Sequence, residues 1–398
     1  MREMKQSGIE WLGEIPKDWK ICPLWVICSH ASSNISQQEL FDIDNGEFPI
    51  FGASGLIKYV DFFRQEKPCL GIVKDGAGVG NVYLLPKQSS VIGTMAYIIS
   101  KNKINLKFLF YLFLSMNIKP NNVSTTIPHI YFSSYGKIKV PYISEETQAA
   151  IVNYLNNKCI KLDSLIENEE KVISELKKYK KSIIQKATTK GISKCELKDS
   201  GVEWIKEIPT HWEVIRISGI YKIRNTKVSD KDYQPLSVGY MGVVPQLENA
   251  AKTNDGDNRK LVMKNDFVIN SRADRRGACG ISNFDGSVSL INIVLQPLKG
   301  GYNNYFEYLF KSTSFSDEFY RWGNGIVDDL WSTKWSEMKR ILIPNPPILE
   351  QKAIAKYLDK KIANVDKTIL IKQQKIAELK EYKKTLIYEY VTGKKEVV

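Results

Sequence analysis

Two long stretches of the chain combine a heptad pattern of apolar positions with charged residues in between. This spacing predicts amphipathic helices whose apolar seams pack against a partner helix. Each stretch follows a proline-marked segment, VPYISEETQ or IPNPPILEQ, which indicates where a helix starts. We therefore predict helical regions at 145–190 and 347–398. The seam residues are Leu162, Ile166, Ile173, Leu176 and Ile183 in the first region and Val365, Ile369, Ile376, Leu379 and Leu386 in the second.

The segments that precede the two helical regions have a different pattern. Short runs of β-branched and apolar residues alternate with Gly and Pro, which is typical of strands and turns. The predicted strands lie at 69–74, 81–85 and 90–100 and at 266–270 and 287–298, and aromatic helices are predicted at 106–116 and 304–322. We therefore predict an α+β fold with two mixed α/β domains, 1–144 and 191–346, separated by the two long helices.

The chain repeats itself around these segments. SGIEWLGEIPKDW at 7–19 returns as SGVEWIKEIPTHW at 200–212, with eight of the thirteen positions identical. A second match pairs QAAIVNYL and ISELKKYKKSII in the first helical region with QKAIAKYL and IAELKEYKKTLI in the second. The segments between these matches do not align convincingly. The frame of the chain is therefore duplicated, whereas the two domains that it carries differ.

Connectivity favours pairing of the long helices with each other over packing of each helix on its own domain. Only TTKGISKCELKDS separates the end of the first helix from the second SGxEW passage, so the two domains are expected at opposite ends of that helix. About 40 helical residues extend roughly 60 Å. The second helix must return, which predicts an antiparallel coiled coil with a pseudo-twofold axis. Because the chain stops where a third SGxEW passage would begin, we also predict a nearly circular arrangement.

The size and charge of the chain limit its possible partners. A chain of 398 residues exceeds the usual size of one domain. Its net charge of +13 favours a polyanionic partner, and nucleic acid is favoured over an anionic membrane. The six cysteines form no CxxC pair and the three histidines lie far apart, which predicts a cytoplasmic protein without a metal site. The most apolar run, 108–116, is too short to span a membrane.

A glycine-rich loop between two predicted strands is the candidate DNA contact of the first domain. Glycines allow a backbone to approach phosphates or base edges closely, although an ordinary hairpin turn would have the same composition. A second polar loop, STTIPHI, follows later in this domain. The candidate residues of both loops are Lys74, Asp75, Gly76, Gly78, Gly80, Asn81, Thr125 and His129.

An arginine-rich loop is the candidate DNA contact of the second domain. The planar guanidinium of arginine matches guanine, and the amide of asparagine matches adenine. A solvated turn is the alternative, but three arginines within five residues beside a strand end favour DNA contact. The candidate residues are Asn270, Ser271, Arg272, Arg275 and Arg276.

No catalytic residue is predicted. NPPI at 345–348 is similar to the motif with which adenine methyltransferases hold a flipped base. However, its fourth residue is Ile348, no glycine-rich cofactor loop lies upstream, and the prolines stand where a helix begins. We therefore expect these residues to have a structural role.

The duplicated SGxEW passages, the helix start IPNPPILEQKAIAKYLD with its counterpart TQAAIVNYLN, and the paired ELKKYKKSII and ELKEYKKTLI resemble the DNA specificity subunits of type I restriction-modification systems. This resemblance implies a non-catalytic subunit that recognises a bipartite, asymmetric target in double-stranded DNA. It implies two methyltransferase subunits and restriction (translocase) subunits as partners, with S-adenosylmethionine, ATP and Mg²⁺ bound by those partners. A stand-alone DNA methyltransferase and a bipartite DNA-binding regulator remain alternatives.

Overall fold

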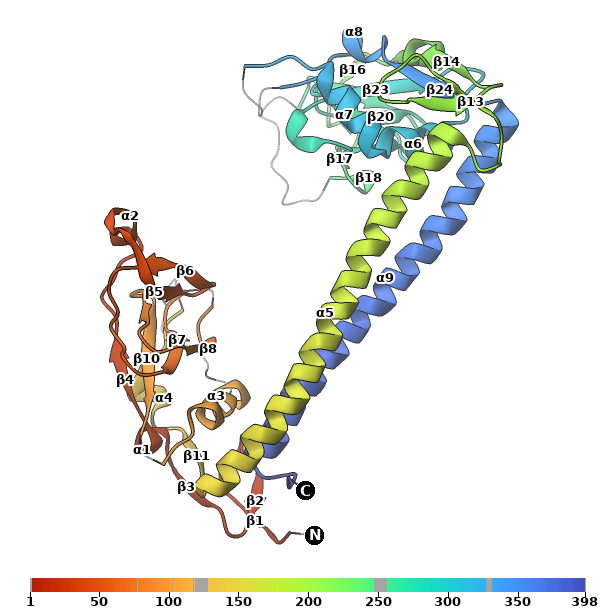
Figure 1. Cartoon of the computed structure of the whole chain (residues 1–398). Coiled ribbons are helices and arrows are strands. Elements are labelled where there is room, and N and C mark those ends of the chain that lie inside the picture. Colours follow the sequence, from red (N-terminus) through yellow and green to blue (C-terminus); the bar gives the residue numbers. More distant parts are fainter. Residues whose placement is uncertain are drawn as a thin grey trace. The chain divides into compact units, whose positions relative to one another are not determined.

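The computed structural model describes residues 2–76, 78–101, 103–116, 118, 128–246, 256–326 and 331–397. The chain divides into two compact units, which we call unit 1 (Met1–Glu170 and Gln373–Val398) and unit 2 (Lys171–Lys372). Each unit contains one mixed α/β domain and part of each of two long helices, α5 (Glu145–Lys190) and α9 (Ile348–Val391) (Figure 1).

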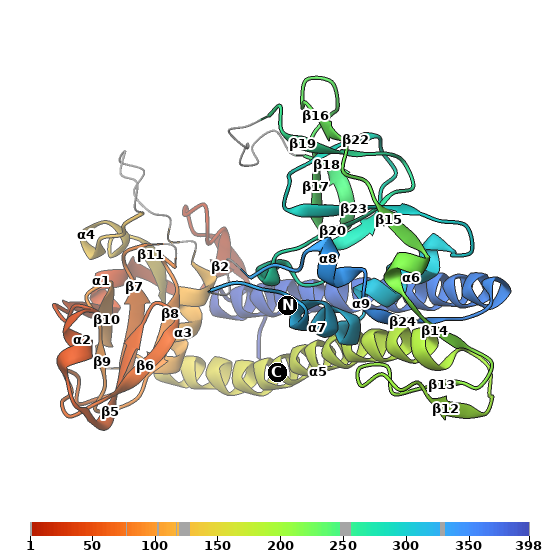
Figure 2. The ribbon, with the colours of Figure 1, turned by 90° about the horizontal axis from the view of Figure 1, so that it is seen from above.

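The domain of unit 1 is built on a four-stranded antiparallel sheet in the order β4-β10-β7-β8. Helix α3 packs on β7 and β8 and lies between this sheet and α5 (Figure 2). The Tyr111 hydroxyl of α3 donates a hydrogen bond to Asn156 of α5 at 2.9 Å. The elements of this domain are β1 (Met4–Gln6), β2 (Glu14–Pro16), β3 (Lys20–Pro23), α1 (Leu24–Ile27), β4 (Cys28–Ser32), α2 (Glu39–Asp42), β5 (Asn45–Gly52), β6 (Gly55–Val60), β7 (Cys69–Val73), β8 (Val82–Leu85), β9 (Ser90–Val91), β10 (Met95–Ser100), α3 (Leu106–Ser115), α4 (Phe132–Tyr135) and β11 (Lys139–Tyr142).

Unit 2 repeats this design with a four-stranded sheet in the order β15-β23-β20-β21. Helix α6 packs on β21, and the Tyr305 hydroxyl donates a hydrogen bond to the Thr188 carbonyl of α5 at 2.8 Å. The elements are β12 (Leu197–Asp199), β13 (Glu207–Pro209), β14 (Glu213–Arg216), η1 (Ile217–Gly219), β15 (Tyr221–Ile223), β16 (Lys227–Val228), β17 (Leu236–Gly239), β18 (Gly242–Pro245), β19 (Arg259–Val262), β20 (Phe267–Asn270), η2 (Ala273–Arg275), β21 (Cys279–Ile281), β22 (Gly286–Val288), β23 (Asn292–Pro297), α6 (Asn303–Lys311), α7 (Thr313–Arg321), α8 (Trp335–Met338) and β24 (Leu342–Asn345).

Three predicted elements were too long. The strand predicted at 90–100 is two strands, because a turn closed by a hydrogen bond from Met95 N to Ile92 O separates β9 from β10. The strand predicted at 287–298 is likewise divided into β22 and β23 by a turn at Ser289. The helix predicted at 304–322 is divided into α6 and α7, because the Ser312 side chain caps the start of α7 by accepting a hydrogen bond from Phe315 N.

Each copy of the repeated passage supplies the connection and the second strand of a two-stranded hairpin, β1-β2 or β12-β13, and the first strand directly precedes the passage. The indole nitrogen of Trp11 donates a hydrogen bond to Lys139 O at 3.1 Å, and that of Trp204 donates to Leu342 O at 3.2 Å. Both acceptors lie in the strand that leads towards the following long helix. The repeated passage therefore fastens the start of each domain to the end of the same domain.

The segment after α9 returns to the start of the chain within unit 1. Tyr388 donates a hydrogen bond to Trp11 O at 2.8 Å, and Lys394 Nζ donates to Leu12 O at 2.7 Å. A Cβ atom at Gly393 would lie 2.5 Å from Pro16, so only glycine fits there. In unit 2, Gly191 after α5 stands against Trp212 in the equivalent way. The segment that follows α9 therefore packs on the first SGxEW passage. The segment that follows α5 packs on the second SGxEW passage in the same way.

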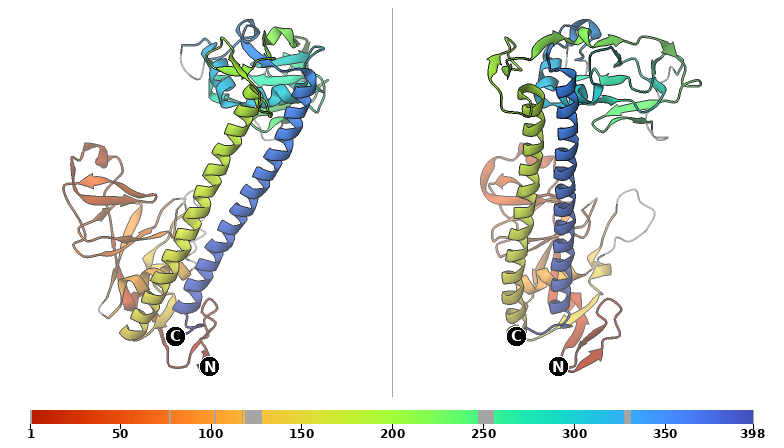
Figure 3. Two further views of the ribbon diagram at one scale, coloured as in Figure 1. Left: turned by 45° about the vertical axis from the view of Figure 1, so that its right-hand side comes forward. Right: turned by 90° about the vertical axis from the view of Figure 1, so that its right-hand side faces the viewer.

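The long helices pair antiparallel in both units, as predicted (Figure 3). Asp163–Lys383 and Glu169–Lys375 form ion pairs in unit 1, and Lys180–Asp366 forms one in unit 2. The residue number rises along one helix as it falls along the other. Of the predicted seam residues, Leu162, Ile166, Ile173, Ile183, Val365, Ile376 and Leu386 are buried, and Leu176, Ile369 and Leu379 are half-buried.

Candidate nucleic-acid interface

The candidate loops of the two domains are the same loop of the fold. The glycine-rich loop joins β7 to β8, and the arginine-rich loop joins β20 to β21. These hairpins occupy identical places in the two four-stranded sheets. Val73 N donates to Asn81 O at 2.9 Å across the first hairpin, and Asn270 N donates to Ala278 O at 2.9 Å across the second. We call them the unit 1 and unit 2 reading hairpins.

Each reading hairpin is joined to a second loop by one isolated β-bridge. Asp75 pairs with His129 in unit 1, and Arg272 pairs with Ser332 in unit 2. The preceding residue of each hairpin accepts a hydrogen bond of 3.0 Å from the second loop, at Lys74 O from Ile130 N and at Ser271 O from Thr333 N. The second loop leads into α4 or α8. The two domains therefore present the same pair of loops, with different side chains at matching positions.

The unit 1 reading hairpin depends on glycine. Gly76 and Gly80 have φ of +92° and +90°, values that side-chain-bearing residues rarely adopt. Gly78 O accepts a hydrogen bond from Asn81 N at 3.0 Å, which closes the turn, and the Asn81 side chain is exposed. The glycines thus fix a tight hairpin turn, and Lys74 and Asn81 stand at its two sides.

Asp75 connects both loops of unit 1 through its side chain. Its carboxylate lies 2.6 Å from His129 Nδ1 and 2.9 Å from Lys74 Nζ. Burial would raise the pKa of Asp75, but the hydrogen bonds from His129 and Lys74 outweigh burial and hold that pKa below its usual value. Asp75 is therefore charged at neutral pH and orients the side chains of Lys74 and His129. Thr125, the remaining candidate in this domain, lies outside the described residues.

The unit 2 reading hairpin separates buried anchors from exposed arginines. Ser271 is buried, and its hydroxyl donates to Ile291 O at 2.6 Å. Asn270 is half-buried and accepts a hydrogen bond from Arg272 N at 3.1 Å. Arg272 and Arg275 are exposed and line a groove of about 370 Å³ together with Asn270. Ser271 therefore positions the loop, whereas Arg272 and Arg275 expose their guanidinium groups at the groove, with Arg275 Nε 3.4 Å from Asp274.

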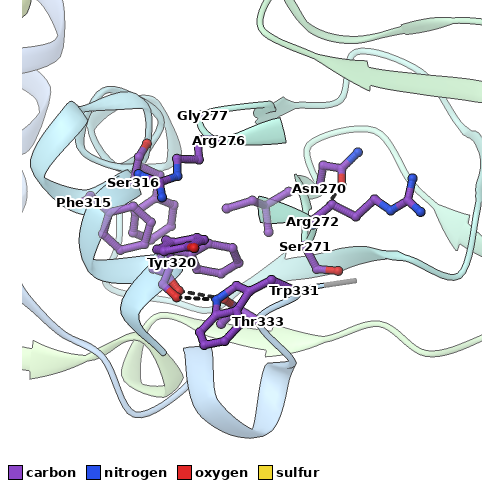
Figure 4. Close-up of a pocket in the computed structure, with 13 residues that line it drawn as sticks. Asn270, Ser271, Arg272, Arg276, Gly277, Phe315, Ser316, Tyr320, Trp331 and Thr333 are labelled. Carbon is purple, nitrogen blue, oxygen red and sulfur yellow. Dashed lines mark hydrogen bonds between the residues drawn. The ribbon is translucent and has the colours of Figure 1, made fainter. Parts of the chain in front are cut away.

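Arg276 is held by an aromatic side chain. Its guanidinium carbon lies 3.8 Å from the centre of the Tyr320 ring, and Nη1 lies 3.1 Å from Asp317. Trp331 donates its indole N–H to Tyr320 O at 3.0 Å, and this hydrogen bond holds Trp331 beside Tyr320. In Figure 4 the Arg276 side chain lies over Tyr320, whereas Arg272 points away from these rings. The two arginines thus face different directions from one loop.

The tip of the β17–β18 hairpin was not predicted to be functional. Tyr240 and Met241 are 66% and 90% exposed. Tyr240 lines the same groove as Arg272 and Arg275. The sequence signal is GYMG at 239–242, where two large apolar residues occupy a tight turn. An aromatic ring at such a place can stack on a base or a sugar.

The other sequence motifs have structural explanations. In the NPPI motif, the Asn345 side chain accepts a hydrogen bond from Gln351 at 3.1 Å, and Pro347 O accepts from Gln351 N at 3.0 Å. The motif therefore forms the start of α9. No group of three potential metal ligands occurs within the described ranges. Among the described helices, none combines the length and the apolar character needed to cross a membrane.

Comparisons with known proteins agree on one family. The model of the type I restriction modification DNA specificity domain matches residues 16–178 and 209–381. A Methanocaldococcus jannaschii protein, provisionally named type I restriction enzyme MjaX specificity subunit, is 24% identical over 423 aligned residues, which cover 96% of this chain and 95% of that relative. The type I restriction enzyme MjaVIII specificity subunit of the same organism is 26% identical over 227 residues, and the match spans 51% of that relative and 54% of this chain.

Solved structures show the same fold. A chain from a study of complex assembly and conformational transition in a type I R-M system has a TM-score of 0.69 and 13% identity, with 95% of this chain and 98% of that chain covered. The HsdS subunit of Thermoanaerobacter tengcongensis has a TM-score of 0.50 and 15% identity over the same shares of both chains.

Proposed function

The chain belongs to the type I restriction modification DNA specificity family, and from this premise we propose that it recognises a bipartite, asymmetric target in double-stranded DNA. The domain of each unit contacts one half of the target through its reading hairpin and the loop bridged to it. The observation that carries this proposal is the matching position of the two reading hairpins, with Asp75 in one where Arg272 stands in the other. Two hairpins with the same backbone fold but oppositely charged side chains at matching positions can recognise two different base sequences.

The duplicated frame supplies two equivalent docking surfaces in this proposal. Two methyltransferase subunits bind them, and restriction (translocase) subunits join the complex. Those partners bind S-adenosylmethionine, ATP and Mg²⁺, and this chain contributes recognition and assembly, without a catalytic residue. Repetition of a surface on one chain allows two copies of one partner to bind.

Methylation mapping tests the proposal. The host methyltransferase is expressed with and without this chain, and methylated adenines are mapped across the genome. We expect methylation only with the chain present, at sites made of two short sequences with a spacer of constant length. Methyl transfer by the purified chain alone would favour a stand-alone methyltransferase. Full function without methyltransferase partners would favour a bipartite regulator.

A further inference from the structure

A groove of about 670 Å³ extends from the unit 2 reading hairpin to α5. Lys177, Lys180 and Lys181 of α5 line one side, and Arg276 of the reading hairpin and Lys311 of α6 line the other. All of these residues belong to unit 2. We call this feature the α5 groove.

The charge of the α5 groove is one-sided. Its five cationic side chains face a single carboxylate, Asp317, among the residues that line it. Three of the cations have acidic partners, in the pairs Arg276–Asp317, Lys311–Glu307 and Lys180–Asp366. Lys177 and Lys181 are exposed, and neither forms an ion pair with a carboxylate in the described part of the chain. Two uncompensated cations, one helical turn apart, therefore remain available for an anion.

The groove is continuous with the reading hairpin. Arg276 lines both the α5 groove and the pocket drawn in Figure 4, which also contains Tyr320 and Trp331. Tyr240, at the tip of the β17–β18 hairpin, lines both the α5 groove and the groove beside Arg272. The shared lining residues Arg276 and Tyr240 therefore connect the α5 groove to the surface of the reading hairpin.

The lysines of the α5 groove have counterparts in the second copy of the repeat. Lys177, Lys180 and Lys181 in ELKKYKKSII correspond to Lys380, Lys383 and Lys384 in ELKEYKKTLI. The second set lies on the part of α9 that belongs to unit 1. Lys180 and Lys383 form equivalent ion pairs across the coiled coil, with Asp366 and Asp163, and Lys380 lies 3.6 Å from Glu170. Lys181 and Lys384 form no ion pair with a carboxylate among the described residues, so the repeat keeps one uncompensated lysine of this set beside each domain.

We propose that the α5 groove binds the phosphates that flank the half-site recognised by unit 2, with Lys177 and Lys181 as the contacting residues. This inference rests on the proposed function for the orientation of DNA at the reading hairpin. These contacts strengthen binding without selecting a sequence, because phosphates carry no direct base information. The binding free energy of these phosphate contacts comes largely from released counterions, so the contacts weaken as the salt concentration rises.

The test compares two double variants of the full chain. Lys177→Gln/Lys181→Gln removes the two groove lysines, and Lys178→Gln/Lys186→Gln removes two exposed lysines of α5 that do not line the groove. Affinity for a labelled duplex of arbitrary sequence is measured over a range of salt concentrations. We expect the slope of log K against log salt to lose about 0.9 for each groove lysine and to stay near wild type in the control. Thermal unfolding verifies that both variants fold.

Equal slopes in the two double variants would overturn the proposal. Unchanged slopes together with lost copurification of the methyltransferase would assign the groove to a protein partner and would also overturn it. Methylation mapping of the same variants separates this result from the proposed function. If wild type methylates bipartite sites while the groove variant keeps the wild-type slope, only the groove proposal fails. If wild type lacks bipartite sites, the proposed function fails, and the DNA path assumed for the groove fails with it.

Discussion

Trp212 donates its indole N–H to a carboxylate oxygen of Glu350 at 2.9 Å, whereas the equivalent Trp19 of unit 1 finds no acceptor among the described residues. The reason lies in the repeat, because Thr147 stands where unit 2 has Glu350. Trp19 is 3% exposed, and its indole nitrogen is buried. A buried donor without a partner costs about 1–3 kcal/mol.

Thr147→Glu is therefore expected to stabilise unit 1. The new carboxylate meets the Trp19 indole and also lies at the N-terminal end of α5, where negative charge is favourable. We expect a gain of about 1 kcal/mol in the free energy of unfolding, measured by denaturant titration. Ala149→Glu is the matched control, because it adds the same charge to the same end of α5 from an exposed position. An equal gain in both variants would show that charge, and not the indole contact, is responsible.

Arg272→Ala is expected to relax recognition in one half of the target only. Arg272 is exposed beside a groove, and a bidentate contact to a base contributes about 1–3 kcal/mol of discrimination. Lys74→Ala removes the cationic side chain of the unit 1 reading hairpin and should affect the other half. Methylation mapping of the two variants checks this assignment. Relaxation of the same half by both variants would contradict it.

The sequence predicted the two long helices and their pairing better than it predicted the folds of the two domains. Heptad spacing and the SGxEW repeat predicted α5, α9 and their antiparallel pairing, because these signals are local and occur twice. The equivalence of the β7–β8 and β20–β21 hairpins was not predictable, since their sequences do not align and their match depends on long-range strand pairing. Gln148 and Gln351 show the same limit. Each is buried near the start of a long helix and accepts a hydrogen bond from a backbone N–H far away in the sequence, that of Asn105 or Tyr302. The spacing of residues along the chain does not predict such a contact.

Asp75→Asn is expected to loosen the two loops of unit 1 in a pH-dependent way. Asp75 has a lowered pKa, so its carboxylate stabilises the folded state above the ordinary value of about 4, and this contribution is lost as the pH falls through the lower, folded-state pKa. The difference in melting temperature between wild type and Asp75→Asn should therefore shrink below about pH 4. Thermal unfolding over a pH series measures it. A difference that persists at the lowest pH would contradict the role assigned to the carboxylate.

Thiol reactivity tests the burial of the domains. Burial raises the pKa of Cys28, Cys69 and Cys279 to about 12, whereas Cys195 is exposed. Because the thiolate is the reactive form, we expect Cys195 to be labelled rapidly at about pH 8. The half-buried Cys22, whose pKa burial raises to about 11, should react slowly, and the four buried thiols, which include Cys159, should react only after unfolding. Cys195→Ser should abolish the rapid phase. Rapid labelling of a buried thiol in that variant would contradict the described core.

Domain exchange tests whether each domain recognises its own half of the target. Residues 213–343, which carry the whole unit 2 reading hairpin between the repeated passages, are replaced by the corresponding segment of a relative, and methylated adenines are mapped with the same methyltransferase. We expect one half of the methylated sequence to change while the other half and the spacer length stay as in wild type. A change in both halves, or in neither, would contradict it.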